Sequence, residues 1–258
     1  MSHDPRSRVS RRQVVAQLLT GASAALLAGC DAVSRTQWFP KILGVGERLT
    51  RGAQHLVTSR RSMAQEFEEA ELSPQFRSNG TSNPQSPAYQ AHARKGFADW
   101  ALQVDGLVAS PATLTLAQLR AMSSRTQITR HDCVEGWSAI GKWTGVPLSE
   151  VLARVKPSDS ARYVVFHCAD PMSSGDLYYE SIDMEDAYHP QTILAYGLND
   201  AVLPIANGAP LRLRVERQLG YKMAKYVMRI ELVASFEHIG RGKGGYWEDR
   251  GYEWFAGI

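Results

Sequence analysis

The sequence His131-Asp132-Cys133-Val134-Glu135-Gly136-Trp137-Ser138 joins a predicted strand, residues 126–130, to a turn rich in glycine and tryptophan. It contains Cys133, one of the three cysteines of the chain. A thiol at the end of a strand, beside histidine and carboxylate side chains, lies where loops usually carry chemistry. Cys133 is therefore a candidate metal or cofactor thiolate, a candidate nucleophile, or a small buried apolar residue.

The overall composition is that of an ordinary globular protein. Of the 258 residues, 44% are hydrophobic and 21% are charged. This length suffices for one large domain or two small ones. The net charge is only +3 and the chain has no basic block, so we expect no nucleic-acid partner. Three cysteines do not form a disulfide framework.

Residues 1–30 have the pattern of an export signal. A basic start with the pair Arg11-Arg12 precedes a short apolar run, and the pair resembles that of a twin-arginine signal. The following Leu27-Ala28-Gly29-Cys30 resembles a bacterial lipobox, although an ordinary cleaved signal with a chance cysteine is the alternative. We expect twin-arginine export to the periplasmic side of the inner membrane and a lipid anchor at Cys30. That pathway often carries cofactor enzymes.

The rest of the chain is expected to form a tether with a short helix, residues 31–71, and one domain, residues 72–258. The start of this domain, residues 72–89, is rich in serine, asparagine, proline and glycine, which is typical of a loop. It is either an exposed linker or an ordered segment that lies across the domain.

Within the domain, strands and helices mix without regular alternation. Residues 100–104 and 163–166 have the pattern of strands, and residues 148–155 place their apolar side chains on one helical face. Thr115 is a candidate helix cap. The predicted fold class is therefore α+β with a largely β body. Cys133 and Cys168 each end a strand, and the sequence leaves open whether they pair.

Two later segments have open interpretations. In residues 211–216 apolar side chains alternate with charged ones, so Arg212 either points to solvent or faces an anionic cofactor. Residues 220–225 offer a flexible backbone and two lysines to a phosphate. The tail, residues 240–258, contains so many aromatic side chains that we expect it to pack on the body.

The patterns of several common sites are missing from the sequence. It has no P-loop, no H-E-x-x-H, no C-x-x-C and no G-x-S-x-G. A Cys–His hydrolase built on Cys133 with His131 or His167 remains an alternative.

Taken together, several separated motifs resemble the sulfite oxidase fold family. Residues 129–138 and 143–148 resemble its molybdenum-binding segment, specifically that of the bacterial periplasmic branch that includes the catalytic subunit of the molybdenum-type methionine sulfoxide reductase. Further similar segments follow in the same order: residues 189–194, 203–204, 207–212 and 220–225, with a similar closing segment at residues 246–254.

This resemblance implies one molybdenum–molybdopterin cofactor, with Cys133 as the protein thiolate on the metal. Glu135 and His131 would handle protons near the metal, or they are structural hydrogen-bonding residues of the loop. The resemblance implies further cofactor contacts at Asn79, Cys168, Asn207, Arg212, Met223, Ala224 and Lys225.

The sequence also departs from the family. The basic residues that follow the ligand cysteine in animal-type sulfite oxidases are absent after Cys133, which makes sulfite a weaker candidate substrate. Asn199, a candidate substrate contact, lies near a position where the reductase has an aromatic residue. The end at Ile258 leaves no room for the dimerisation domain of larger sulfite oxidases, so we expect a monomer.

The resulting prediction is an exported molybdenum-dependent oxidoreductase that transfers an oxygen atom, with S-oxides such as methionine sulfoxide as substrates. A sulfite oxidase-type dehydrogenase is the first alternative, and a cofactor-free periplasmic lipoprotein is another. The chain has no haem or iron–sulfur motif. We therefore expect an external electron partner, either a membrane haem- or quinone-linked protein or a c-type cytochrome.

Overall fold

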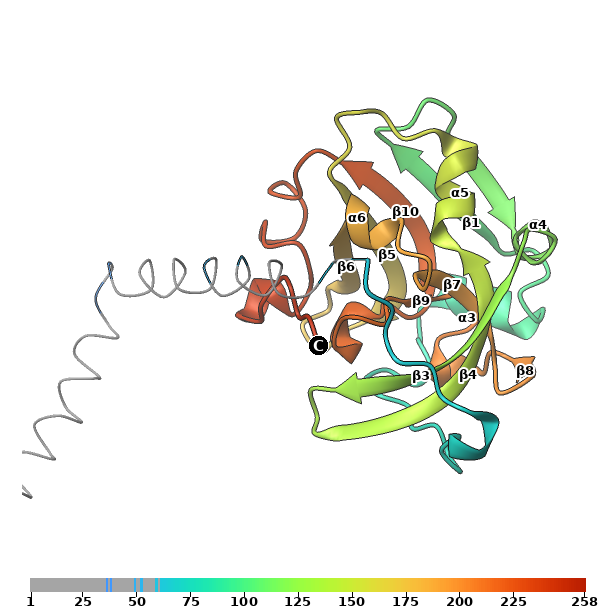
Figure 1. Ribbon diagram of the computed structural model, residues 1–258. Coiled ribbons are helices and arrows are strands. Elements are labelled where there is room, and N and C mark those ends of the chain that lie inside the picture. The colour runs from blue at the N-terminus through green and yellow to red at the C-terminus, as the bar shows by residue number, and fades with distance from the viewer. Residues whose placement is uncertain (1–35, 37, 39–48, 50–51, 53–58, 60) are drawn as a thin grey trace, which may run out of the picture. The chain divides into compact units, whose positions relative to one another are not determined.

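The computed structural model describes residues 36, 38, 49, 52, 59 and 61–258. The chain divides into two units, residues 1–59 and residues 60–258. The predicted export signal, residues 1–30 with Cys30, lies outside the described residues, as does most of the predicted tether. The elements from Glu69 onward all belong to the second unit (Figure 1).

One sheet of the second unit has the strand order β2-β1-β10-β5-β6. Neighbouring strands are antiparallel, except that β1 and β10 run parallel, so the sheet is mixed. Its strands are β1 (Ala101–Gly106), β2 (Ala112–Thr115), β5 (Tyr163–Pro171), β6 (Leu177–Asp183) and β10 (Val227–Val233).

The other sheet has the order β3-β4-β7-β8, and β9 pairs with β7. A long hairpin of β3 and β4 dominates it and brings Cys133 opposite Trp137 (Figure 1). Its strands are β3 (Arg125–Cys133), β4 (Trp137–Pro147), β7 (Ile193–Leu198), β8 (Ala201–Val202) and β9 (Arg212–Arg214). Two sheets with short helices confirm the predicted α+β class with a largely β body.

The helices are short and begin where the sequence places capping residues. Thr115 Oγ1 accepts a hydrogen bond from the Gln118 amide at the start of α4. The apolar face predicted for residues 148–155 is fully buried on α5. The helices are α3 (Pro87–Arg94), α4 (Leu116–Arg120), α5 (Leu148–Val155) and α6 (Met184–Ala187), with 3₁₀ turns η1 (Glu69–Glu71), η2 (Ile205–Asn207), η3 (Gly220–Lys222) and η4 (Glu248–Arg250).

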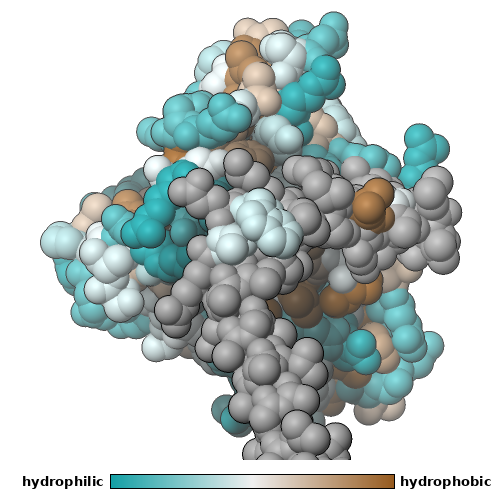
Figure 2. All heavy atoms as spheres, turned by 90° about the vertical axis from the view of Figure 1, so that its left-hand side faces the viewer, coloured by the Kyte–Doolittle hydropathy of each residue, from teal (hydrophilic) through white to brown (hydrophobic). Residues whose placement is uncertain are grey.

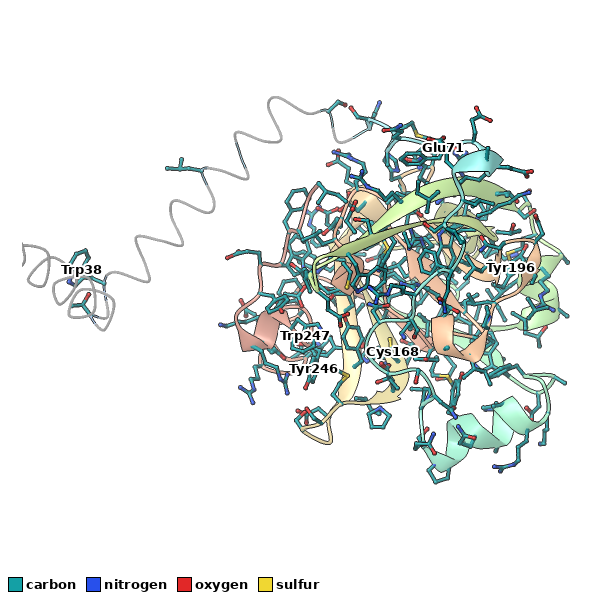
Figure 3. The ribbon with its side chains drawn as sticks, turned by 90° about the horizontal axis from the view of Figure 1, so that it is seen from below. Trp38, Glu71, Cys168, Tyr196, Tyr246 and Trp247 are labelled. Carbon is teal, nitrogen blue, oxygen red and sulfur yellow. The ribbon has the colours of Figure 1, made fainter. Side chains whose placement is uncertain are left out.

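Two segments without regular structure pack closely on the body. Residues 72–86 lie across the domain, where Ser78 Oγ donates to the carbonyl of Ala206 at 2.6 Å. The tail is docked as predicted: the Tyr246 amide donates to the Tyr179 carbonyl at 3.0 Å, and Tyr246 and Trp247 contact one another (Figure 3). Residues 66–67, upstream of the predicted domain boundary at residue 72, already pair with β3. The boundary itself remains a prediction.

On the face shown in Figure 2, hydrophilic residues predominate, with smaller hydrophobic areas between them. Among the residues that the structure describes, no helix is both long and apolar enough to cross a membrane.

Candidate functional site

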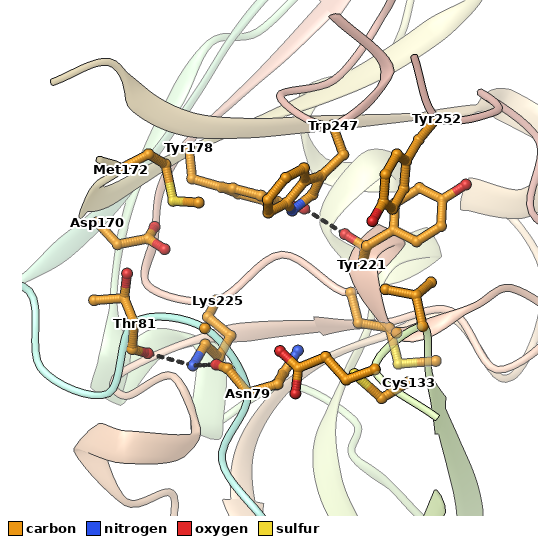
Figure 4. Close-up of a pocket in the computed structure, with 15 residues that line it drawn as sticks. Asn79, Thr81, Cys133, Asp170, Met172, Tyr178, Tyr221, Lys225, Trp247 and Tyr252 are labelled. Atoms are coloured by element: carbon orange, nitrogen blue, oxygen red, sulfur yellow. Dashed lines mark hydrogen bonds between the residues drawn. The ribbon is translucent and has the colours of Figure 1, made fainter. Parts of the chain in front are cut away.

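A cavity of about 190 Å³ lies where β3 ends and the tail crosses the body (Figure 4). Cys133, the last residue of β3, lies in its wall with 9% of its surface exposed. Small molecules and cofactors bind in concave sites that combine apolar side chains with a few polar groups. The cavity is lined by Asn79, Gly80, Thr81, Cys133, Val134, Glu135, Asp170, Met172, Tyr178, Gly220, Tyr221, Met223, Lys225, Trp247 and Tyr252.

The hairpin turn fixes the position of the Cys133 thiol. Gly136, with φ 83°, closes the turn by donating its amide to the Cys133 carbonyl at 3.0 Å. Burial and, to a smaller degree, the nearby Glu135 carboxylate raise the pKa of Cys133. The free thiol is therefore a poor nucleophile, whereas a bound soft metal would hold it deprotonated.

The two histidines considered as bases for Cys133 are engaged elsewhere. His131 is completely buried, and its Nδ1 accepts a hydrogen bond from Arg214 at 3.1 Å. Burial and the neighbouring arginines lower the pKa of His131 well below its usual value. His167 pairs with Glu231 at 2.9 Å and lines a different cavity. The structure therefore does not support the Cys–His hydrolase, and it places His131 behind the cavity wall.

Both arginines of β9 are buried, so the expectation that alternation points Arg212 to solvent is wrong. The sheet and its covering segments enclose both faces of this strand. Arg214 forms two hydrogen bonds to Glu216, at 2.9 and 2.5 Å, and lies 4.3 Å from the Trp143 ring. Arg212 donates to the Asn207 carbonyl at 3.1 Å. Burial, and then Arg214, lower the pKa of Arg212 to about 9.

Lys225 ties the segment of residues 72–86 to the cavity. Its Nζ donates to the carbonyls of Asn79 at 2.6 Å, Thr81 at 2.5 Å and Ala206 at 3.2 Å. Burial, and then Arg212, lower the pKa of Lys225 to about 7. The segment is thus ordered across the domain, as one of the two sequence interpretations predicted.

Several buried polar atoms at or beside the cavity have no hydrogen-bond partner among the described residues. They are Asn79 Oδ1, Asp170 Oδ1, Asn207 Nδ2, and Nε and Nη2 of Arg212. Unpartnered buried polar atoms are uncommon because each is costly. A phosphate would satisfy the free donors and neutralise the cations that Lys225 and Arg212 place together. The residues present therefore fit an anionic cofactor with its own donors and acceptors.

Sequence reasoning missed Asp170, which lies near the end of β5, as a site residue. Its carboxyl is 4% exposed and lies in the cavity wall. Burial raises the pKa of Asp170 to about 6. The tail residues Trp247 and Tyr252 were also missed, although the density of aromatic residues in the tail was a usable signal.

Of the remaining predicted contact residues, some line the cavity and others do not. Met223 lines it, and Ala224 is buried next to Met223. Cys168 is buried, is a free thiol like Cys133, and lines the other cavity. Asn199 is not at the cavity: it is an exposed turn residue with φ 51°, and its Oδ1 accepts from the Lys142 amide. Its proposed substrate contact therefore finds no support in the geometry.

The fold and the site define a mixed α+β protein whose cavity, beside a buried thiol, fits an anionic cofactor. The family described as oxidoreductase molybdopterin binding domain matches residues 89–238, which is more than half of the chain. The chain belongs to this family. The matched region includes the predicted ligand Cys133 and ends before the aromatic tail.

Curated relatives extend the comparison. A subunit from Azospira oryzae, provisionally named protein-methionine-sulfoxide reductase subunit YedZ1, is 46% identical over 160 residues, which are 62% of this chain and 56% of the relative. The protein-methionine-sulfoxide reductase catalytic subunits MsrP of Xanthomonas campestris and Ralstonia nicotianae are each 42% identical over 144 residues. These cover 52% of this chain and 45% and 44% of the relatives. The chain thus spans about half the length of these relatives.

Among solved structures, the sulfane dehydrogenase SoxCD from Paracoccus pantotrophus matches with a TM-score of 0.49 and 24% identity. The match covers 54% of this chain and 39% of that chain. A likeness at this level says nothing of substrate or partner.

Proposed function

We propose that this chain is a molybdopterin-dependent oxidoreductase that reduces S-oxides such as methionine sulfoxide. The relatives named as methionine-sulfoxide reductases support this substrate class. Reduction of an S-oxide consumes two electrons and two protons and releases a thioether and water. The molybdenum cofactor, when bound, supplies the redox chemistry, and the protein supplies orientation, electrostatics and protons.

The single observation that carries the proposal is the thiol of Cys133 in the wall of a cavity that Lys225 also lines, with unpartnered donors of buried Arg212 beside it. In this proposal Cys133 is the thiolate ligand of molybdenum. Asn79, Asn207, Arg212 and Lys225 hold the pterin and its phosphate. The backbone at Met223 and Ala224 and the side chain of Cys168 make further contacts with the cofactor.

Glu135 is our candidate for moving protons at the reaction centre. It lines the cavity two residues from Cys133, and its Oε2 accepts a hydrogen bond from Trp137 Nε1 at 3.0 Å. That bond holds the carboxylate in one position while leaving Oε1 for the reacting oxygen. For His131 we propose positioning of the β3 end, because its ring is buried and engaged with Arg214.

The cavity favours a neutral S-oxide over sulfite, the alternative substrate. Lys225 is the only cation among the residues that line it, and Glu135 and Asp170 add two carboxyl groups. Because Lys225 would serve the cofactor phosphate, sulfite would meet no free cation there. Carboxylates near the reaction centre would repel a dianion.

The test is elemental analysis of the exported protein, from a host that makes the cofactor, beside Cys133→Ser. We expect about one molybdenum per wild-type chain and an altered or empty site in the variant. Loaded wild type should reduce peptide methionine sulfoxide with a viologen donor, while faster sulfite oxidation would favour the alternative. Well-folded wild type without molybdenum and pterin would point instead to a cofactor-free lipoprotein.

We further propose export by the twin-arginine pathway, a lipid anchor at Cys30 and a location on the periplasmic side of the inner membrane. The signal pattern of residues 1–30 supports this. Electrons would come from a membrane haem- or quinone-linked protein or a c-type cytochrome. Membrane fractionation of wild type beside Cys30→Ser tests the anchor: release of the variant alone is expected, and equal distribution contradicts it.

A further inference from the structure

The cavity at Cys133 has two chemically different sides. Thr81, Asn79 and Lys225 lie on one side, and four aromatic side chains lie on the other (Figure 4). The aromatic side is made of Tyr178, Tyr221, Trp247 and Tyr252. Lys225 and the unpartnered Asn79 Oδ1 belong to the polar side, which therefore suits the cofactor. The aromatic side is left for another ligand.

Trp247 and Tyr252 belong to the tail, which lies beyond the family match at residues 89–238. Their rings are stacked, with centroids 5.3 Å apart and planes 29° apart. Tyr252 also meets the Tyr221 ring edge-on at 5.2 Å. These three rings, Tyr221, Trp247 and Tyr252, form an aromatic wall. Tyr221 belongs to the matched region, and the tail adds Trp247 and Tyr252 to it.

Buried interactions hold the tail in place without a ligand. Lys222 Nζ lies 2.5 Å from a carboxylate oxygen of Glu180 on β6 and 2.5 Å from one of Glu248 in the tail. Tyr221 Oη donates to the Glu253 carbonyl at 2.6 Å. Because these side chains are already held in place, binding of a ligand costs little free energy for ordering them.

The chemistry of the wall suits a neutral, polarisable group. Its rings offer faces and edges to sulfur and methyl groups, and Met172 and Met223 extend the apolar surface of the cavity. Lys222, whose Nζ lies 6.0 Å from the centroid of the Tyr221 ring, is completely buried and already shared by two carboxylates. Among the described residues that line the cavity, the aromatic side thus offers an oxyanion no cation.

We infer that the aromatic wall is a substrate-selecting surface that receives the neutral alkyl S-oxide of an oxidised methionine side chain in a polypeptide. This inference rests on the proposed S-oxide reductase function. Trp247 and Tyr252 bind the substrate next to the reaction centre and discriminate against oxyanions. The tail thereby contributes to the substrate specificity of the family domain.

The test uses holoenzyme with Trp247→Ala, Trp247→Phe and Tyr252→Ala. The control is Tyr188→Ala, an exposed tyrosine outside the cavity. The probe is a short neutral peptide with one methionine sulfoxide. Its Kd is measured by calorimetry on oxidised enzyme without electron donor, and its KM and kcat with reduced viologen. Molybdenum content and the absorption spectrum report cofactor loading.

We expect Trp247→Ala to raise both Kd and KM about tenfold. The value of kcat, the molybdenum content, the spectrum and the Kd of sulfite should stay near those of wild type. Trp247→Phe should restore most of the affinity, Tyr252→Ala should weaken binding, and Tyr188→Ala should do nothing.

Fully loaded Trp247→Ala and Tyr252→Ala with wild-type Kd for the peptide would overturn the inference and leave the proposed function intact. Loaded wild type that neither binds nor reduces the peptide would overturn the proposed function, and the inference with it. If Trp247→Ala loses molybdenum, Trp247→Phe and Tyr252→Ala, once loaded, decide by the same Kd comparison.

Discussion

Arg214 Nη1 lies 3.1 Å from Nδ1 of His131, and both side chains are completely buried. A guanidinium group only donates, so Nδ1 must accept and the ring proton must be on Nε2. His131 precedes Cys133 by two residues on β3. A side chain of β9 therefore fixes the end of the strand that presents the thiol to the cavity.

Replacing Arg214 should destabilise the protein strongly. Arg214→Met removes the donor to His131 and leaves the Glu216 carboxylate buried without its cation. We expect the free energy of unfolding, measured by urea titration of cofactor-free protein, to fall by about 3 kcal/mol. Arg214→Met with Glu216→Gln should recover part of the loss, because no unpaired charge remains. A loss below about 1 kcal/mol in the single variant would contradict the arrangement.

Gly220 should not tolerate a side chain. A Cβ added there would lie 2.4 Å from Cε1 and 2.5 Å from Nε2 of His131. Gly220→Ala should therefore lower the free energy of unfolding by about 2 kcal/mol and reduce the molybdenum retained after purification. Gly96→Asn is the control, since Gly96 has φ 57° and nothing within 4 Å of an added Cβ. Equal thermal midpoints for the two variants would refute the close packing.

Asp170 should make cofactor-free protein less stable at higher pH. Burial raises its pKa from 3.8 to about 6, so the folded state binds its proton more tightly than the unfolded state does. The cost of burying the charge is fully present above pH 6 and disappears as pH falls towards 4. Asp170→Asn should thus stabilise the protein by about 1–2 kcal/mol at pH 8 and hardly at all at pH 4. Urea titrations at both pH values check this, and a pH-independent effect would disprove the assigned cause.

Lys222 should hold the tail. Lys222→Met leaves Glu180 and Glu248 buried without a cation, and burial and Glu248 already raise the pKa of Glu180 well above its usual value. We expect a loss of about 3 kcal/mol in the free energy of unfolding and new protease cleavage within residues 240–258. Lys95→Met, which removes an exposed lysine paired with Asp99 at 2.6 Å, should leave both readouts unchanged. A tail that stays resistant in Lys222→Met would show that other contacts hold it.

Local patterns predicted much of the fold. The cap at Thr115 and the buried face of α5 depend on neighbouring residues in the chain, so periodicity suffices to find them. The resemblance carried by the segment around Cys133 pointed to the family that the match at residues 89–238 then confirmed.

The candidate site was predicted only in part. Cys133, Glu135, Asn79, Met223 and Lys225 do line one cavity. Asp170, Trp247 and Tyr252 were missed, because their place in that cavity depends on contacts between segments far apart in the sequence. Asn199 was proposed from the resemblance to the reductase, and in the structure it is an exposed residue with φ 51° that does not line this cavity.

The sequence by itself determined the fold class, the strand that ends in Cys133 and the apolar face of α5, because these follow from short-range periodicity and from motifs in a fixed order. Only the tertiary structure decided that Arg212 and Arg214 are buried and that the tail and Cys133 line one cavity. Alternation along a strand shows that its two faces differ in polarity. Only the packing of other elements decides whether the charged face is exposed to solvent or buried in the protein.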